Sequence, residues 1–170
     1  MLNIRKNMCM MLLLASILSI NLLIACSSQQ KVEPEKVIAI PQNATSEEIH
    51  DVLNATPSSE EENKESGISA ENYDGNTFAG YEGQISFYYN ENGSVLYYKW
   101  FLTEKDEKKA KEIYSDVCQA LSGSYGDGEE NNSEASGLYT TSFTNDKQQI
   151  TAQMQKANDS GYEISYMVVG

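Results

Sequence analysis

Alternation of apolar and polar residues is the clearest pattern in the second half of the chain, and it predicts β-strands. Residues 83–89 and 95–102 alternate on either side of a short polar loop. An Asn-Gly pair in that loop favours a two-residue hairpin turn, because both central residues of such a turn need a positive φ. With Asn92 and Gly93 at the centre, the period of two places three facing pairs on one side of the sheet. These pairs are Tyr89 with Leu96, Phe87 with Tyr98 and Ile85 with Trp100.

The opposite side of this predicted hairpin carries Tyr88, Tyr97, Phe101 and Lys99. Tyrosine-rich patches are common at interfaces, since each ring offers a large contact area at a low entropic cost. The same rings are also typical strand formers that cover a pleated surface without binding anything. We interpret these four residues as a candidate partner surface, for a protein or for a cell-wall glycan.

Helical periodicity follows the hairpin, with Thr103 as the expected N-cap. Acidic residues occupy the first turn, where they suit the helix dipole, and Gly123 is expected near the end. The apolar residues recur at helical spacing and define a buried face. They are Ala110, Ile113, Tyr114, Val117, Cys118 and Leu121.

Three further alternating segments, residues 139–143, 150–154 and 164–168, complete the pattern and predict a C-terminal meander. The element order is then ββαβββ. We predict an α+β fold, a single small domain over residues 71–170 with an antiparallel sheet and one helix packed on one face. The polar stretch 127–137 is expected to be a solvated loop.

The segment before this domain has a different composition. Residues 27–70 contain no aromatic residue, and they carry nine acids and three lysines. Such a segment cannot bury enough apolar surface to offset the entropy of ordering it. The sequence therefore predicts that residues 26–70 form a lipidated cysteine followed by a disordered acidic tether.

One short segment with a helical pattern interrupts the predicted tether. Thr45 and Glu48 have the spacing of a capping box, and Ile49, Val52 and Leu53 form an apolar stripe. The stripe fits a short helix that docks on a partner. It also fits a transient helical turn, because isolated helices of this length are marginal in water.

The N-terminus has the layout of a secretory signal peptide, predicted over residues 1–25. Arg5 and Lys6 precede an apolar run over residues 8–23, and small residues follow. A retained membrane-spanning helix is disfavoured, because polar residues interrupt the run and it is shorter than the roughly 20 residues needed to cross a bilayer.

The end of this run, Leu23-Ile24-Ala25-Cys26, resembles the lipobox of bacterial lipoproteins. The resemblance implies that a diacylglycerol is attached to the thiol of Cys26 and that the chain is cut just before it. Each buried methylene of an acyl chain contributes about 0.8 kcal/mol, so two chains give stable anchoring. The implied location is a cell membrane, with the protein lipid-anchored and facing the extracytoplasmic side.

The net charge limits the kinds of partner that the protein can bind, and the cysteine content limits the covalent bonds that it can form. The net charge is −13, and removal of Arg5 and Lys6 with the signal makes it two units more negative. Such a surface argues against nucleic acid, whose phosphates require lysine and arginine. After loss of Cys9 and lipidation of Cys26, Cys118 has no partner for an intramolecular disulfide. We expect no cofactor, and no metal site of the Cys/His type.

A catalytic centre is not evident in the sequence. His50 is the only histidine, and it lies in the predicted tether, away from a core that could orient it as a base. The first hypothesis is therefore a membrane-anchored protein with a small non-catalytic binding or accessory domain. The alternative is a small extracytoplasmic hydrolase that uses carboxylates of residues 127–134, such as Glu129 and Glu130. This stretch lacks the central glycine of a calcium-binding loop.

Overall fold

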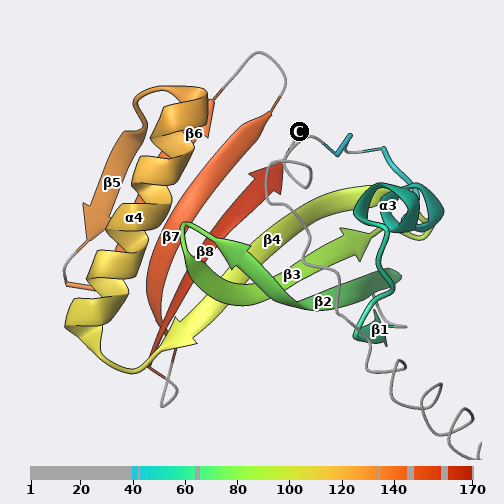
Figure 1. The fold of residues 1–170 in the computed structure, drawn as a ribbon, viewed down its shortest axis with the longest axis horizontal. Coiled ribbons are helices and arrows are strands. Elements are labelled where there is room, and N and C mark those ends of the chain that lie inside the picture. Colours follow the sequence, from blue (N-terminus) through green and yellow to red (C-terminus); the bar gives the residue numbers. More distant parts are fainter. Residues whose placement is uncertain are drawn as a thin grey trace, which may run out of the picture.

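The computed structural model describes residues 40–41, 43–63, 66–133, 135–144, 148–157 and 161–169. This part of the chain forms one antiparallel sheet of eight strands and two helices (Figure 1). In chain order the elements are α3 (Ser46–Leu53), β1 (Ser59–Asn63), β2 (Ile68–Phe78), β3 (Tyr81–Tyr89), β4 (Val95–Glu104), α4 (Glu107–Tyr125), β5 (Glu129–Ser133), β6 (Leu138–Thr144), β7 (Gln149–Ala157) and β8 (Gly161–Val169).

The order of elements repeats once along the described chain. Each half consists of a helix followed by four strands, and the strand order across the sheet is β1-β2-β3-β4-β8-β7-β6-β5. The last strands of the two halves, β4 and β8, therefore pair at the centre, where Trp100 lies opposite Tyr166. The first strands, β1 and β5, form the two edges. The strand order is therefore symmetric about the central β4–β8 pair.

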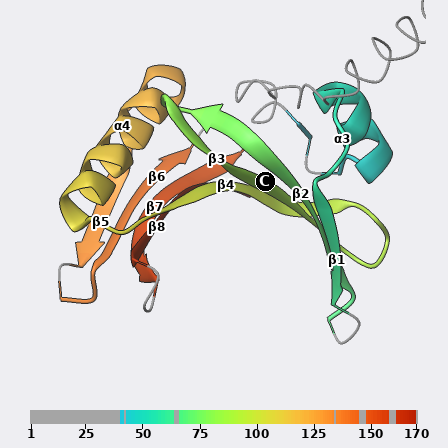
Figure 2. The ribbon, with the colours of Figure 1, turned by 60° about the horizontal axis from the view of Figure 1, so that its bottom comes forward.

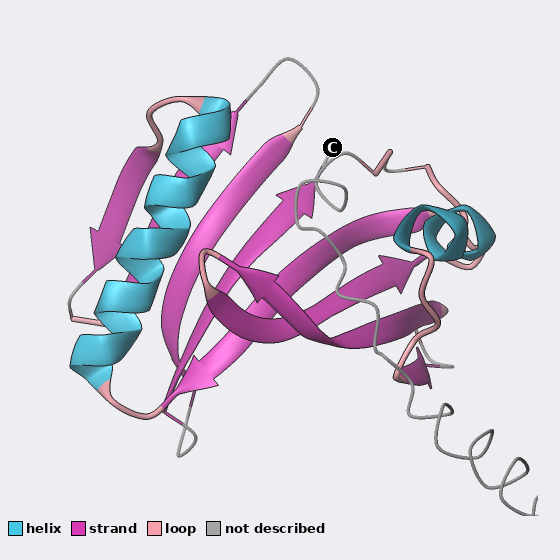
Figure 3. Cartoon of the chain, in the orientation of Figure 1, coloured by secondary structure: helices cyan, strands magenta, loops and turns pink. Residues whose placement is uncertain are grey.

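The predicted antiparallel sheet with a helix on one face is confirmed, but the ββαβββ order is wrong. The prediction lacked α3, β1, β2 and β5, and with eight strands the fold is mostly β (Figure 3). Strands β1 and β5 contain no apolar residue, and all their residues are exposed. Hydrophobic periodicity therefore cannot reveal them. Charged edge strands of this kind protect a sheet against pairing with other chains.

The β3–β4 hairpin confirms most of the predicted register. Phe87 faces Tyr98 and Ile85 faces Trp100, as expected, but Tyr89 pairs with Val95 instead of Leu96. A β-bulge between these pairs shifts the register. Leu96 is consequently 38% exposed, and Val95 takes the buried position.

The loop that joins β3 and β4 explains the shift. The amide of Gly93 donates to the carbonyl of Asn90 at 2.9 Å, which places Glu91 and Asn92 at the centre of the turn. Only Gly93 has a positive φ in this loop, at +74°. A turn followed by one left-handed residue is the usual origin of a bulge in a hairpin. The predicted turn centred on Asn92 and Gly93 is therefore wrong.

A two-residue turn with positive φ occurs instead between β2 and β3. Ala79 and Gly80 have φ of 49° and 86°, and they join the facing residues Phe78 and Tyr81. A bulge interrupts β2 between residues 73 and 76 and bends it. The end of the hairpin lies over the helix-covered side of the sheet.

Aromatic contacts hold this bent hairpin in place. The ring of Phe78 lies 5.7 Å from that of Trp100 and 4.7 Å from that of Tyr166. The indole nitrogen of Trp100 donates to the carbonyl of Asn76 at 3.1 Å. This bond gives a backbone carbonyl at the bulge a hydrogen-bond partner. The end of the β2–β3 hairpin thereby covers the part of the core that lies between the two helices.

Both helices lie on the same side of the curved sheet (Figure 2). The predicted apolar face of the long helix is confirmed, since Ala110, Ile113, Val117 and Leu121 of α4 are buried. Its N-cap is Asp106 rather than Thr103, because β4 continues through Glu104. The core side chains of the sheet point toward the helices, and no described helix packs on the opposite side. We call that opposite side the open face.

The folded domain begins earlier than predicted. Helix α3 has the expected capping box between Thr45 and Glu48, and Ile49 and Leu53 are buried in the common core. The amide of Val95 also donates to the carbonyl of Ala44 at 3.1 Å. The helix is thus neither a transient turn nor free for a partner, and the described residues 46–63 and 66–70 belong to the domain rather than to a tether. The predicted signal peptide and Cys26 lie outside the described residues.

Candidate functional site

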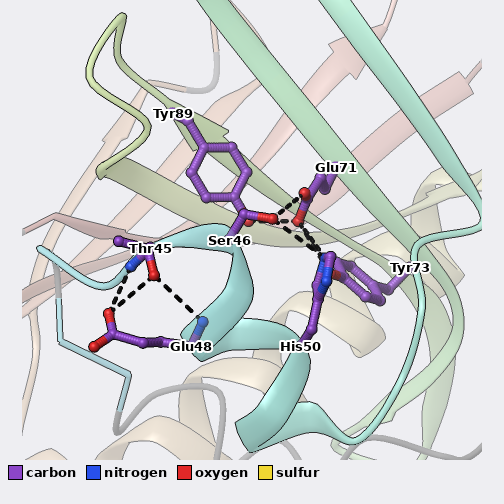
Figure 4. A network of polar contacts seen from close by, with 7 residues as sticks. All are labelled: Thr45, Ser46, Glu48, His50, Glu71, Tyr73 and Tyr89. Carbon is purple, nitrogen blue, oxygen red and sulfur yellow. Dashed lines mark hydrogen bonds and ion pairs between the residues drawn. The ribbon is translucent and has the colours of Figure 1, made fainter.

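A partly buried carboxylate, Glu71 on β2, is the centre of a polar cluster. Its Oε1 accepts a hydrogen bond from Ser46 Oγ at 2.5 Å. Its Oε2 accepts from the hydroxyl of Tyr89 at 2.6 Å and from that of Tyr73 at 3.1 Å. His50 Nε2 lies 3.1 Å from the same oxygen, and the side chain of Glu71 is only 12% exposed (Figure 4). We call these five residues the Glu71 cluster.

Three elements bring the Glu71 cluster together. Ser46 and His50 are four residues apart on α3 and therefore lie on the same side of the helix. Glu71 and Tyr73 are alternate residues of β2 and point to the same side of the sheet, while Tyr89 comes from β3. The prediction that His50 lies away from any core is wrong. Sequence reasoning missed the cluster because it placed α3 in a disordered segment.

The cluster favours the ionised form of Glu71. Burial raises the pKa of this carboxyl group, but hydrogen bonds from Ser46 and Tyr89 act in the opposite direction. The hydroxyl of Tyr73 and the nearby His50 add to them, and the pKa of Glu71 is lowered overall. Burial and the Glu71 carboxylate raise the pKa of both tyrosines, which therefore stay protonated as donors.

The residue types of the cluster resemble a Ser-His-acid triad, but the geometry does not fit one. Ser46 Oγ lies 3.3 Å from His50 Nε2, the same nitrogen that contacts Glu71. In a triad the acid bonds to the other ring nitrogen, and the serine gives its proton to the histidine. Here Ser46 donates to the carboxylate itself. The cluster therefore fastens α3 to the sheet.

The open face brings all four predicted surface residues together. Tyr88 and Tyr97 face each other across β3 and β4, with ring centroids 4.4 Å apart and planes inclined by 18°. Lys99 Nζ lies 4.5 Å from the ring centroid of Phe101. The same ammonium group pairs with Glu163 Oε1 of β8 at 3.1 Å. Tyr97, Lys99 and Phe101 are alternate residues of β4, so the two pairs lie next to each other on the same side of the sheet, and we call these four residues the aromatic strip.

Side-chain hydrogen bonds order the rest of the open face. Ser86 donates to Asn72 at 2.6 Å, and Asn72 donates to Ser59 at 3.1 Å. On the other side of the aromatic strip, Gln153 donates to Gln155 at 2.9 Å. The first two contacts join β3, β2 and β1, whereas Gln153 and Gln155 both belong to β7. The face is thus a fixed surface of rings, amides and hydroxyls.

The two named carboxylates of the predicted hydrolase site, Glu129 and Glu130, do not converge. Residues 129–133 form strand β5 instead of the predicted loop. Glu129 lies opposite Ser142 and Glu130 opposite Thr141, and consecutive residues of a strand point to opposite sides of a sheet. Both side chains are exposed. The two acids therefore do not share a cleft.

Cys118 lies half-buried on α4, and burial raises the pKa of its thiol. Within the described residues, no group of three or more His, Cys, Asp or Glu side chains could hold a metal ion. No helix of this described part is long and apolar enough to cross a membrane. Comparison with protein-family models, with curated proteins and with solved structures finds no match.

Proposed function

We propose that this protein is a bacterial lipoprotein, anchored outside the cytoplasmic membrane by a lipid on Cys26, whose domain binds a partner without catalysis. The resemblance of Leu23-Ile24-Ala25-Cys26 to a lipobox supports the anchor. In this proposal residues 1–25 are removed, and residues 27–39 link the lipid to the folded domain. The acidic domain then stays at the membrane through its acyl chains, because its charge gives it no attraction to anionic lipid.

The observation that supports binding best is the stacked pair of Tyr88 and Tyr97 on the open face. Both rings are half-buried, so part of each is open to solvent on a side of the sheet that no described helix covers. Tyrosine rings gathered on a surface in this way are common at interaction sites. Lys99 and Phe101, which contact each other, extend the patch along β4. A rigid, pre-ordered surface loses little entropy when a partner binds.

The alternative of a hydrolase draws no support from the geometry. Glu129 and Glu130 point away from each other, and acid–base hydrolysis needs two groups that reach the same substrate bond. In the Glu71 cluster the carboxylate is already occupied by its own donors. A non-catalytic binding domain is the function that we propose.

Partner capture from native membranes tests this proposal. We combine three substitutions in the full chain, Tyr88→Ser, Tyr97→Ser and Phe101→Ser. This variant and the wild-type protein are each crosslinked on the membrane and purified, and the proteins captured with them are compared. We expect loss of the captured partner with an unchanged circular dichroism spectrum. Tyr81→Ser is the matched control, because Tyr81 hydrogen-bonds to Asp116 on the helix side. Equal capture by the triple variant and by the wild-type protein would refute the proposed surface.

A further inference from the structure

Two buried tyrosine hydroxyls on the helix side of the sheet have no hydrogen-bond partner among the described residues. They belong to Tyr98 on β4 and Tyr166 on β8, and both side chains are 0% exposed. We propose that these hydroxyls bind the carbonyl oxygen of a small, neutral, apolar ligand that packs among the surrounding aromatic rings. This site goes beyond the proposed function, because it lies on the opposite side of the sheet from the open face.

The other buried tyrosines of the described core have partners. The hydroxyls of Tyr73 and Tyr89 both donate to the carboxylate of Glu71. A buried hydroxyl without a partner costs the free energy of removing it from water, and phenylalanine at the same position would avoid that cost. Such a group in a folded protein calls for a partner that completes its bond. Two of them on neighbouring strands therefore point to one shared ligand.

The strand register brings the two tyrosines together. Tyr98 pairs with Val168 and Tyr166 pairs with Trp100, so the two tyrosines are diagonal neighbours on the same side of the sheet. Burial raises the pKa of both phenol groups, and the nearby Tyr166 raises that of Tyr98 further. Tyr125, at the end of α4, is close enough to raise both. Both groups therefore stay protonated as donors, and a carbonyl oxygen has two lone pairs with which to accept from them.

The surroundings of the pair favour a neutral, apolar ligand. The ring of Tyr166 stacks on the indole of Trp100, with planes inclined by 13°. The ring of Phe78 lies 4.7 Å from that of Tyr166, and the ring of Phe87 lies 5.3 Å from that of Tyr98. No charged side chain of the described residues is buried, so an anion here would lack a counter-charge. An apolar lining with a few converging polar groups is typical of small-molecule sites.

A ligand reaches the shielded hydroxyls only when a covering segment moves. The end of the β2–β3 hairpin covers this part of the core, since Phe78 contacts Tyr166. The hydroxyl of Tyr81 connects this end to Asp116 of α4 at 2.6 Å (Figure 1). That hydrogen bond is exposed, and water competes for both of its groups. Entry past the hairpin predicts that Tyr81→Phe binds the ligand faster than the wild-type protein, and an unchanged rate would contradict this route.

Tryptophan fluorescence of the full chain in detergent micelles tests the site. Trp100 is the only tryptophan of the chain, and its contact with Tyr166 makes it a local reporter. The probes are cyclohexanone and 2-nonanone, a ring and a chain that each carry one carbonyl group. We expect saturable quenching by at least one of these ketones. Methylcyclohexane, which lacks the oxygen, and cyclohexanecarboxylate, which is an anion, should not displace the ketone at an equal free concentration.

Two pairs of substitutions separate a ligand site from ordinary packing. Tyr98→Phe with Tyr166→Phe should weaken ketone binding by about tenfold or more, because two hydrogen bonds are lost. Without ketone this variant should melt at the wild-type temperature or above it, since it removes unpartnered polar groups. Tyr73→Phe with Tyr89→Phe is the matched control. It should lower the melting temperature and leave the ketone affinity unchanged.

Four results would overturn the inference. They are no saturable quenching by either ketone, displacement by methylcyclohexane as readily as by cyclohexanone, a ketone affinity that the Tyr98→Phe and Tyr166→Phe substitutions do not change, and a lower melting temperature of that variant without ketone. The last result would mean that the hydroxyls are already bonded in the folded protein, as they would be to an internal water. None of these results bears on capture through the open face, so the proposed function is judged separately.

Discussion

Tyr88 and Tyr97 lie opposite each other on β3 and β4, with ring centroids 4.4 Å apart, on a side of the sheet that no described helix covers. The two rings belong to the one hairpin whose register was largely evident from the sequence. Their stack fixes the centre of the open face, and the proposed function depends on it.

The stack should contribute measurably to stability. In a double-mutant cycle of Tyr88→Ala and Tyr97→Ala, we expect a coupling energy of about 0.5–1.5 kcal/mol, the range of stacked aromatic pairs. Urea unfolding of the four proteins measures it. The control is a second cycle that combines Tyr88→Ala with Glu112→Ala. Because Glu112 lies on α4, the destabilising effects of these two substitutions should be additive. Additive effects for the tyrosine pair itself would show that the stack has no energetic role.

The Glu71 cluster should make the domain sensitive to acid. The pKa of Glu71 in the folded state is below its ordinary value of 4.5, so the cluster stabilises the fold above that pH. The contribution is lost as the pH falls through the folded-state pKa. Glu71→Gln should cost about 1.5–3 kcal/mol near neutral pH, as expected for hydrogen bonds to a charged group. The unfolding free energy of the Glu71→Gln variant should also fall less steeply than that of the wild-type protein as the pH is lowered.

Urea unfolding across the acidic range measures both effects. Tyr89→Phe is the matched variant, because it removes one donor and leaves the carboxylate in place. It should cost less than Glu71→Gln and keep most of the acid dependence. An identical pH profile for Glu71→Gln and the wild-type protein would contradict the role given to the cluster.

The cluster also shows a limit of sequence reasoning. The capping box of Thr45 and Glu48 predicts the helix, and the stripe of Ile49 and Leu53 predicts its apolar face. Neither indicates that the helix packs on its own sheet, because the surrounding composition is that of a disordered segment. The long-range contact of His50 with Glu71 can be seen only in the folded chain.

Helix α3 should unfold together with the sheet. Ile49 is fully buried, and Ile49→Ala should destabilise the domain by about 2–5 kcal/mol. Val52 lies on the same helix but is 47% exposed, so Val52→Ala should have little effect. Thermal unfolding followed by circular dichroism compares them. Equal stability of the two variants would mean that α3 is not part of the cooperative unit.

Strands were predictable where apolar residues alternate and not elsewhere. The elements β3, β4, β6, β7, β8 and α4 each bury an apolar face, and the sequence indicates them. The edge strands β1 and β5 form through backbone pairing with a neighbour, which leaves no pattern in their polar residues. In β2 the bulge before Asn76 breaks the alternation. The open face was predicted because its residues alternate with those of the core.

The lipid anchor is tested at Cys26. Cys26→Ala removes the thiol that would carry the diacylglycerol, so the protein should be released or stay as an unprocessed precursor. Metabolic labelling with a fatty acid, followed by membrane fractionation, measures both outcomes. Cys118→Ala is the control, because it should keep the label. A Cys26→Ala protein that still carries fatty acid would contradict the lipoprotein assignment.

Photocrosslinking from the open face in intact cells tests the central proposal most directly. A photoreactive benzoylphenylalanine replaces Tyr88 in one strain and Lys108 in another, since Lys108 is 89% exposed on α4. The account predicts a discrete crosslinked product from position 88 that is absent from position 108. Products from position 108 alone, or the same product from both positions, would contradict a binding role for the open face.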